Sequence, residues 1–256
     1  MQFNGYKSGG LKMDMTSYKV KIKGLTGSKK KESTETFIDN EKEKIANFLK
    51  EKNVEYLVHF TPVKNLKSIL EHGICSNKYC NEHGIKYIPT DADRFDGYTD
   101  FISLSISFPN YKMFYKKRQT MDEDFAVLLI DSSVLNLYGA NERKFSNKNA
   151  AANNSQKGGN FANLKQMFER PELREKLGLQ ENYTTDPQAE ILLKGRIPTE
   201  YIKEIHFNTL FDYEDAKEYV KDDVLKLGSP MFAKRRDYEF WSSKGNYYGE
   251  KTCIFY

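Results

Sequence analysis

The chain has 256 residues, of which 39% are hydrophobic and 30% are charged, so it is long enough to bury one sizeable core and is neither collagen-like nor wholly disordered. Its net charge of +4 is too mild to identify a nucleic-acid partner by itself. No apolar run approaches the roughly 20 residues of a membrane-spanning helix, so we expect a soluble intracellular protein without membrane contact. Its cysteines, Cys75, Cys80 and Cys253, are too scattered for a zinc site or a disulfide framework, which predicts no metal.

The start of the chain divides by composition. Residues 1–38 are polar and rich in Lys, Ser, Thr and Gly, which indicates an N-terminal extension ahead of a single domain at 39–256. Asn40 followed by Glu43 resembles a capping box, and the apolar residues after it repeat at helical spacing. The pattern predicts a helix at about 41–52.

A strand and a helix should follow. The apolar run at 56–60 predicts a strand. Thr61 as a hydroxyl cap and Pro62 as the first helical residue predict a helix that ends at His72. Gly73 follows directly, and glycine commonly terminates a helix.

Short apolar runs separated by Asn-, Gly- and Asp-rich stretches make up the rest of the chain. The expected elements are, in order, a loop at 75–100, a strand at 101–107, a helix at 109–118, a strand at 125–130, a loop at 139–160, two short helices within 161–178, strands at 187–193 and 201–207, a helix at 212–227, and strand-like runs at 238–241 and 253–256. Strands mixed irregularly with short helices indicate an α+β protein.

The predicted strand at 187–193 carries the strongest candidate for chemistry. Residues i and i+2 of a strand share a face, so Gln188 and Glu190 should project together. Apolar residues follow Glu190 on both faces, and a carboxylate buried there is costly without a partner or a function. The alternative is an edge-strand carboxylate paired with Lys194 or Arg196.

A second candidate, His59, lies near the end of the first predicted strand and beside a predicted helix N-terminus. Helix N-terminal amides favour anions, so His59 is a candidate ligand for a phosphate or a ribose hydroxyl. The alternative is a hydrogen-bonded core histidine. The chain has no Gly-rich dinucleotide loop, Walker A sequence, serine elbow or paired metal-ligand histidines, which weakens Rossmann, kinase, hydrolase and zinc-protease readings.

Two motifs occur in a fixed order. Residues 56–74 read YLVHFTPVKNLKSILEHGI, and residues 189–193 read AEILL, with Ile197-Pro198 and Tyr201-Ile202 behind them. The first resembles the opening motif, and the second the catalytic glutamate strand, of the DarT family of DNA ADP-ribosyltransferase toxins. The resemblance covers about residues 55–207.

This resemblance implies the ADP-ribosyltransferase fold, in which two small mixed sheets flanked by short helices form a cleft for NAD. It implies catalysis by Glu190 with Gln188. The carboxylate would accept the 2′-hydroxyl of the nicotinamide ribose and stabilise an oxocarbenium-like centre as nicotinamide leaves. NAD would be the co-substrate, without a metal, and the residues that bind it would be His59, Thr61, Asn65 and, through its backbone, Gly73. Arg94, in the loop before the strand at 101–107, is a further candidate to contact the pyrophosphate or ribose of NAD, and the alternative for it is a loop salt bridge.

Residues 107–115 resemble the central segment of the family, where thymine-modifying members carry an arginine. Here that position is Asn110, and the Gln188-x-Glu190 pair is similar to that of guanine-modifying ADP-ribosyltransferases, so we expect guanine rather than thymine as the target. Chemistry on a base edge needs the base outside a duplex, which favours single-stranded DNA. The expected acceptor-binding residues are Asn110, Lys112, Arg118, Tyr183 and Thr185, with phosphate contacts from the basic clusters 116–118 and 234–236.

The resemblance further implies a toxin of the bacterial cytoplasm, acting in a toxin–antitoxin or phage-defence system and neutralised by a macrodomain antitoxin. One alternative keeps the fold and changes the acceptor to RNA. Another is a catalytically silent nucleic-acid-binding module, which the intact Glu190 and His59 argue against.

Overall fold

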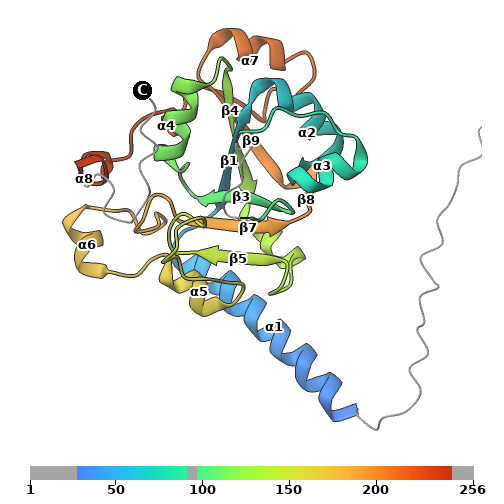
Figure 1. Ribbon diagram of the computed structural model, residues 1–256, viewed down its shortest axis with the longest axis vertical. Coiled ribbons are helices and arrows are strands. Elements are labelled where there is room, and N and C mark those ends of the chain that lie inside the picture. Colours follow the sequence, from blue (N-terminus) through green and yellow to red (C-terminus); the bar gives the residue numbers. More distant parts are fainter. Residues whose placement is uncertain (1–27, 91–96, 244–256) are drawn as a thin grey trace, which may run out of the picture.

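The computed structural model describes residues 28–90 and 97–243, with side chains from Asn40 onward (Figure 1). The helices are α1 (Ser28–Glu51), α2 (Leu66–His72), α3 (Asn77–His83), α4 (Tyr111–Thr120), α5 (Phe161–Gln166), α6 (Pro171–Lys176), α7 (Leu210–Ala216) and α8 (Tyr238–Ser243). The strands are β1 (Tyr56–Pro62), β2 (Ile74–Cys75), β3 (Phe101–Ile106), β4 (Phe125–Asp131), β5 (Arg143–Ser146), β6 (Lys157–Gly158), β7 (Glu190–Lys194), β8 (Arg196–Ile197), β9 (Ile202–Phe207) and β10 (Leu225–Leu227). Among these residues, no helix is long and apolar enough to cross a membrane.

Eight strands form one mixed sheet in the order β10-β9-β4-β1-β3-β7-β5-β6, and β2 pairs with β8 in a separate two-stranded sheet. The large sheet divides at the junction of β1 and β3. The β1–β4 pairing runs the full length of β1, whereas β1 pairs with β3 only at Leu57–Ile106 and Val58–Ser105. In Figure 1, β1, β4 and β9 run upright, while β3, β7 and β5 run across them. The two small sheets expected from the sequence are therefore two differently oriented halves of one continuous sheet.

One core joins the two halves. Buried side chains of β1 and β4, such as Leu57 and Leu128, belong to the same apolar cluster as Ile191 and Leu193 of β7. Helix α1 adds its apolar face to this cluster through Ile45, Phe48 and Leu49, which are all buried. The amphipathic pattern read from the sequence is thus confirmed for this helix, and the burial fixes the relative position of the two halves.

Two predicted helix starts are wrong. Helix α1 begins at Ser28, so Asn40 lies inside the helix and caps nothing, and the helix also crosses the predicted boundary at residue 38. Strand β1 continues through Thr61 to Pro62, which lies opposite Phe125, so Thr61 is not a helix cap. Pairing with β4 overrides the local capping signal, and α2 begins only at Leu66, after a 3₁₀ turn.

Regular structure also occurs where the sequence predicts loops. Helix α3 lies within 75–100, capped by the Ser76 hydroxyl, and β5 and β6 lie within 139–160. The helix predicted at 212–227 ends at Ala216 and is followed by β10, and the strand-like run at 238–241 lies in helix α8. The run at 253–256 lies outside the described residues. The strands near 56, 101, 125, 190 and 202, and the two short helices of 161–178, are confirmed.

Candidate active site

Glu190 is the first residue of β7 and is 7% exposed. On one side it lies opposite Ser146 of β5. On the other side, the pairing of β7 with β3 ends at Leu104–Ile191, so Glu190 lies one residue beyond the last paired residue. Directly opposed residues share a face of the sheet, so the small polar side chain of Ser146 borders the buried carboxylate.

Gln188 does not extend this strand. It lies in a turn in which its backbone N–H donates to Oδ1 of Asp186 (2.8 Å), and the Ala189 N–H donates to the Asp186 carbonyl (3.1 Å). The prediction that Gln188 and Glu190 share a strand face is therefore wrong, because the aspartate holds a turn just before the strand begins. Gln188 is half-buried, and its side-chain amide makes no hydrogen bond to another described residue.

Positive charges surround the same turn. Burial raises the pKa of Asp186, and the Gln188 N–H and the charges of Lys112, Lys148 and Arg235 act in the opposite direction. These cations come from α4, from the segment after β5 and from the segment before α8. Lys112, predicted to bind the acceptor, thus lies near the turn that precedes Glu190. Lys112 and Lys148 suit this region to a phosphate-bearing ligand, whereas the charge of Arg235 is balanced by Asp237.

Asn110, just before α4, has a buried side-chain donor without a partner among the described residues. Its Oδ1 accepts from the Met113 N–H (3.2 Å) at the start of α4, and its own N–H donates to Oγ of Ser105 (2.9 Å). The cap directs the amide oxygen to the helix, and the buried Nδ2 has no partner among the described residues. The buried Ser107 and Tyr111 hydroxyls also lack one there. Buried polar groups without partners are costly, and a ligand at this position would satisfy them.

Tyr183 and Thr185 lie in the segment that leads to Glu190, in different roles. The Tyr183 ring is half-buried, with its centroid 5.7 Å from that of Phe108. The Thr185 hydroxyl donates to the Glu169 carbonyl (2.6 Å) and accepts from Arg174 (3.2 Å), so it holds the segment together. Arg174 also donates to the Tyr183 carbonyl (2.6 Å), a role that no local sequence motif indicates.

His59 and Thr61 both lie on strand β1. His59 Nδ1 donates to the Ser103 carbonyl (3.1 Å) beyond the point where the β1–β3 pairing ends. A carbonyl only accepts, so Nδ1 carries the proton. Strand β1 is two strands away from β7, about 10 Å at the usual strand spacing. His59 and Glu190 therefore belong to different halves of the sheet, which meet where β1 pairs with β3.

Asn65 uses its amide within the protein. Nδ2 donates to Thr61 Oγ1 (2.9 Å) and to the Ile88 carbonyl (2.9 Å), while Oδ1 accepts from the Ile88 N–H (2.7 Å). The side chain thereby ties the segment around Ile88 to the end of β1. The structure thus places Asn65 just beyond the end of β1, in a supporting position.

Gly73 allows close contact between two strands. It follows α2 with φ of +82°, and a Cβ atom built on it would lie 2.3 Å from the Ile197 carbonyl oxygen. Its neighbour Ile74 pairs with Ile197 in the β2–β8 sheet. Both the backbone conformation and the approach to β8 require glycine here.

We expect Gly73→Ala to lower the free energy of unfolding by about 2–4 kcal/mol, because strain at positive φ adds to the clash with the β8 backbone. Gly84→Ala is the matched control: its φ is +66°, but nothing lies within 4 Å of a Cβ atom built on it, so strain alone should cost about 1 kcal/mol. Urea unfolding of both variants measures the difference, and equal losses would contradict the role of the β8 contact.

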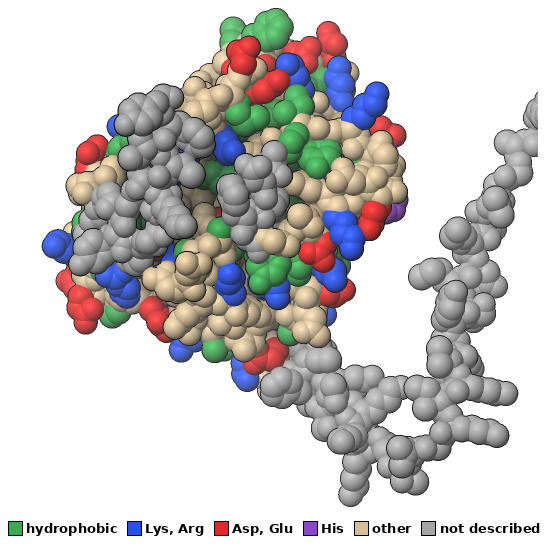
Figure 2. Space-filling view, in the orientation of Figure 1, with side chains coloured by type: hydrophobic (Ala, Val, Ile, Leu, Met, Phe, Trp, Pro, Cys, Tyr) green, Lys and Arg blue, Asp and Glu red, His purple; other side chains and the backbone are tan. Residues whose placement is uncertain are grey.

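Arg118 is directed away from this region. It donates to the Phe232 carbonyl (3.1 Å), and its guanidinium lies 5.4 Å from the Phe114 ring centroid and 5.3 Å from that of Phe232. On the face shown in Figure 2, Lys and Arg side chains are interspersed with Asp and Glu rather than gathered in one patch. Arg94 lies outside the described residues.

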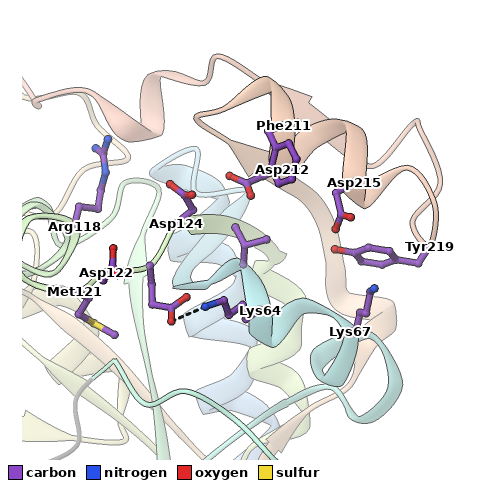
Figure 3. Close-up of a pocket in the computed structure, with 12 residues that line it drawn as sticks. Lys64, Lys67, Arg118, Met121, Asp122, Asp124, Phe211, Asp212, Asp215 and Tyr219 are labelled. Carbon is purple, nitrogen blue, oxygen red and sulfur yellow. Dashed lines mark hydrogen bonds and ion pairs between the residues drawn. The ribbon is translucent and has the colours of Figure 1, made fainter.

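A groove of about 680 Å³ lies between α2, α7 and the segment that connects α4 to β4 (Figure 3). Of the predicted site residues that the structure describes, only Arg118 lines it. Lys64 is paired with Glu123 (3.0 Å), and the lining carboxylates outnumber the cations. The carboxylates are Asp122, Glu123, Asp124, Asp212 and Asp215, and the cations are Lys64, Lys67 and Arg118. This excess of negative charge disfavours a phosphate-bearing ligand in the groove.

The family model described as "ssDNA thymidine ADP-ribosyltransferase, DarT" matches residues 58–237, which is more than half of the chain and includes both β1 and β7. The chain belongs to the DarT family. The expected family and enzyme class, a DNA ADP-ribosyltransferase, are thereby confirmed. No curated protein sequence matches the chain significantly.

Solved structures support the fold. Thermosipho africanus DarTG in complex with ADP-ribose is 18% identical with a TM-score of 0.51, over 70% of this chain and 50% of that one. Thermus sp. 2.9 DarT in complex with ADP-ribosylated ssDNA is 16% identical with a TM-score of 0.51, over 73% of this chain and 96% of that one. The chain thus spans about half the length of the DarTG protein. These similarities confirm the α+β ADP-ribosyltransferase fold.

Proposed function

We propose that this protein transfers ADP-ribose from NAD to a base of single-stranded DNA at the junction of β1, β3 and β7. The observation that carries the proposal is the buried carboxylate of Glu190 at the start of β7, in a chain of the DarT family. The buried Asn110 Nδ2, which has no partner among the described residues, supports a ligand at the end of β3. NAD is the co-substrate and supplies the ADP-ribosyl group, with nicotinamide as the leaving group.

The residues fit NAD by their chemistry. Glu190 holds a ribose hydroxyl and stabilises the positive charge that develops at the neighbouring carbon as the glycosidic bond weakens. Lys112 and Lys148 supply positive charge for the pyrophosphate. His59 and Thr61 bind NAD from β1, Asn65 supports that strand end, and Gly73 lets β2 approach β8.

Guanine is the base we propose as the acceptor. Gln188 lies just before Glu190, and its amide presents both a donor and an acceptor to the edge of guanine. Asn110 adds the donor Nδ2, because its Oδ1 accepts from the Met113 N–H. Tyr183 provides a ring on which a base outside a duplex can stack. Thymine is the second candidate, because the matching family model is described as a thymidine ADP-ribosyltransferase.

Intact mass spectrometry of four single-stranded oligonucleotides, each with one candidate base in a common background, tests this assignment. We expect an NAD-dependent ADP-ribose adduct only on the strand that contains guanine. An adduct only on the thymine strand would retain the enzyme and overturn the base assignment. No adduct on any strand, with an adduct on RNA, would overturn DNA as the acceptor.

We further propose that the protein is a toxin of the bacterial cytoplasm that is neutralised by a macrodomain antitoxin. A modified base blocks the pairing edge of the template, which explains toxicity in physical terms. Induced expression in a bacterial host should stop growth, and co-expression of a macrodomain that hydrolyses ADP-ribosyl-DNA should restore it. Growth arrest that persists with such a macrodomain would contradict this role.

A further inference from the structure

Arg235 and Asp237 form a buried ion pair that the reaction proposed above does not use. They are 5% and 2% exposed, respectively. Arg235 Nε donates to Asp237 Oδ1 (2.7 Å), and the terminal nitrogen Nη2 donates to Oδ2 (2.5 Å). This bidentate geometry fixes the plane of the guanidinium. A cluster predicted to contact phosphate thus has its central arginine locked inside the protein.

The fixed guanidinium contacts two aromatic rings from different parts of the site. Its carbon lies 5.6 Å from the Tyr111 ring centroid at the start of α4 and 5.2 Å from that of Tyr183. The Tyr183 ring also meets Phe108 edge-on, at an interplanar angle of 67°. Arg235 and Phe108 therefore hold one aromatic ring from two directions.

The backbone on either side of this ring is also held. Arg174 donates to the Tyr183 carbonyl, and the Asp186 turn follows three residues later. Tyr183 is nevertheless only half-buried, so part of its side chain faces solvent. A rigid, partly exposed ring in the segment that leads to Glu190 is suited to stacking with a nucleobase.

We propose that Arg235, held by Asp237, is a positioning residue that fixes the Tyr183 ring as the stacking platform for the acceptor base. This inference rests on the proposed function, since it concerns the DNA that the enzyme modifies. The proposed role affects the two substrates differently. Binding and modification of DNA depend on Arg235, whereas cleavage of NAD in the absence of DNA does not.

Removal of both charges tests this role. Arg235→Met alone leaves Asp237 buried without its partner, which destabilises the fold, whereas the double variant Arg235→Met/Asp237→Val removes that charge as well. We expect the double variant to hydrolyse NAD without DNA at the wild-type rate and to raise the KM for single-stranded DNA about ten- to a hundred-fold, the loss of one stacking contact. Lys50→Met, an exposed cation on α1, is the control and should leave the KM for DNA unchanged.

Tyr183→Leu provides a second variant that keeps both charges. Because Arg235 acts through the Tyr183 ring, combining Tyr183→Leu with the double variant should raise the KM for DNA no further than Tyr183→Leu does alone. Additive effects, an unchanged KM in the double variant, or a parallel loss of NAD hydrolysis would each overturn the role of Arg235. A wild-type protein that leaves DNA unmodified would instead overturn the proposed function, and this inference with it.

Discussion

Glu190→Gln should slow ADP-ribose transfer to single-stranded DNA by about 10² to 10³-fold or more, because the amide has the shape of the carboxylate without its charge. The charge is needed most when positive charge develops on the ribose, so the loss should appear in kcat rather than in the KM for NAD. Initial rates of adduct formation, measured over a range of NAD concentrations, separate the two parameters.

Glu200→Gln is the matched control for this change, since Glu200 is an exposed glutamate in the turn before β9. It should leave both kcat and KM at the wild-type values. A Glu190→Gln protein that is folded and retains more than a tenth of the wild-type kcat would show that the carboxylate does not carry the reaction.

Arg143→Met should cause the largest loss of stability, about 3 kcal/mol or more. Arg143 is 2% exposed and donates to the carbonyls of Tyr138 (2.8 Å), Leu135 (3.3 Å) and Gly159 (3.0 Å). Burial lowers the pKa of Arg143, and Glu41 of α1 opposes that shift. Methionine fills a similar volume and leaves buried carbonyls without their donor, which costs about 1–3 kcal/mol for each such group.

Lys144→Met serves as the comparison for Arg143→Met, because Lys144 is the next residue of β5 and its amino group lies over the Tyr98 and Phe101 rings. Methionine keeps much of that packing, so the expected change is below about 1 kcal/mol. Guanidinium unfolding of both variants gives the two values. If the Arg143 variant were no less stable than the Lys144 variant, the hydrogen bonds from Arg143 to the three carbonyls would not stabilise the fold.

The two motifs predicted the fold family because each contains a strand that can be recognised from its own apolar residues. In the structure, β1 and β7 are these strands, and they pair with neighbouring strands as extended segments do. The 139–160 segment shows the opposite case. Its polar composition indicates a loop, but the buried Arg143 gathers carbonyls that lie up to 16 residues away, and no local pattern reports such a contact.

Some features of the site could likewise be predicted from the sequence, and others could not. Glu190 follows from a charge at the start of an apolar strand, and the structure buries it as expected. Gln188 shows the limit of the period-two rule, because the Asp186 turn ends the strand before the rule applies. The partners of Tyr183 could not be read from sequence, since Phe108 and Arg235 come from segments distant along the chain.

A crystal structure of the Glu190→Gln protein with NAD would show where the co-substrate binds, because the slow variant retains its substrate. We expect NAD at the β1–β3–β7 junction, with the nicotinamide ribose at residue 190 and with contacts to His59 or Thr61 of β1. NAD bound in the groove beside α7, or elsewhere away from residue 190, would contradict this expectation.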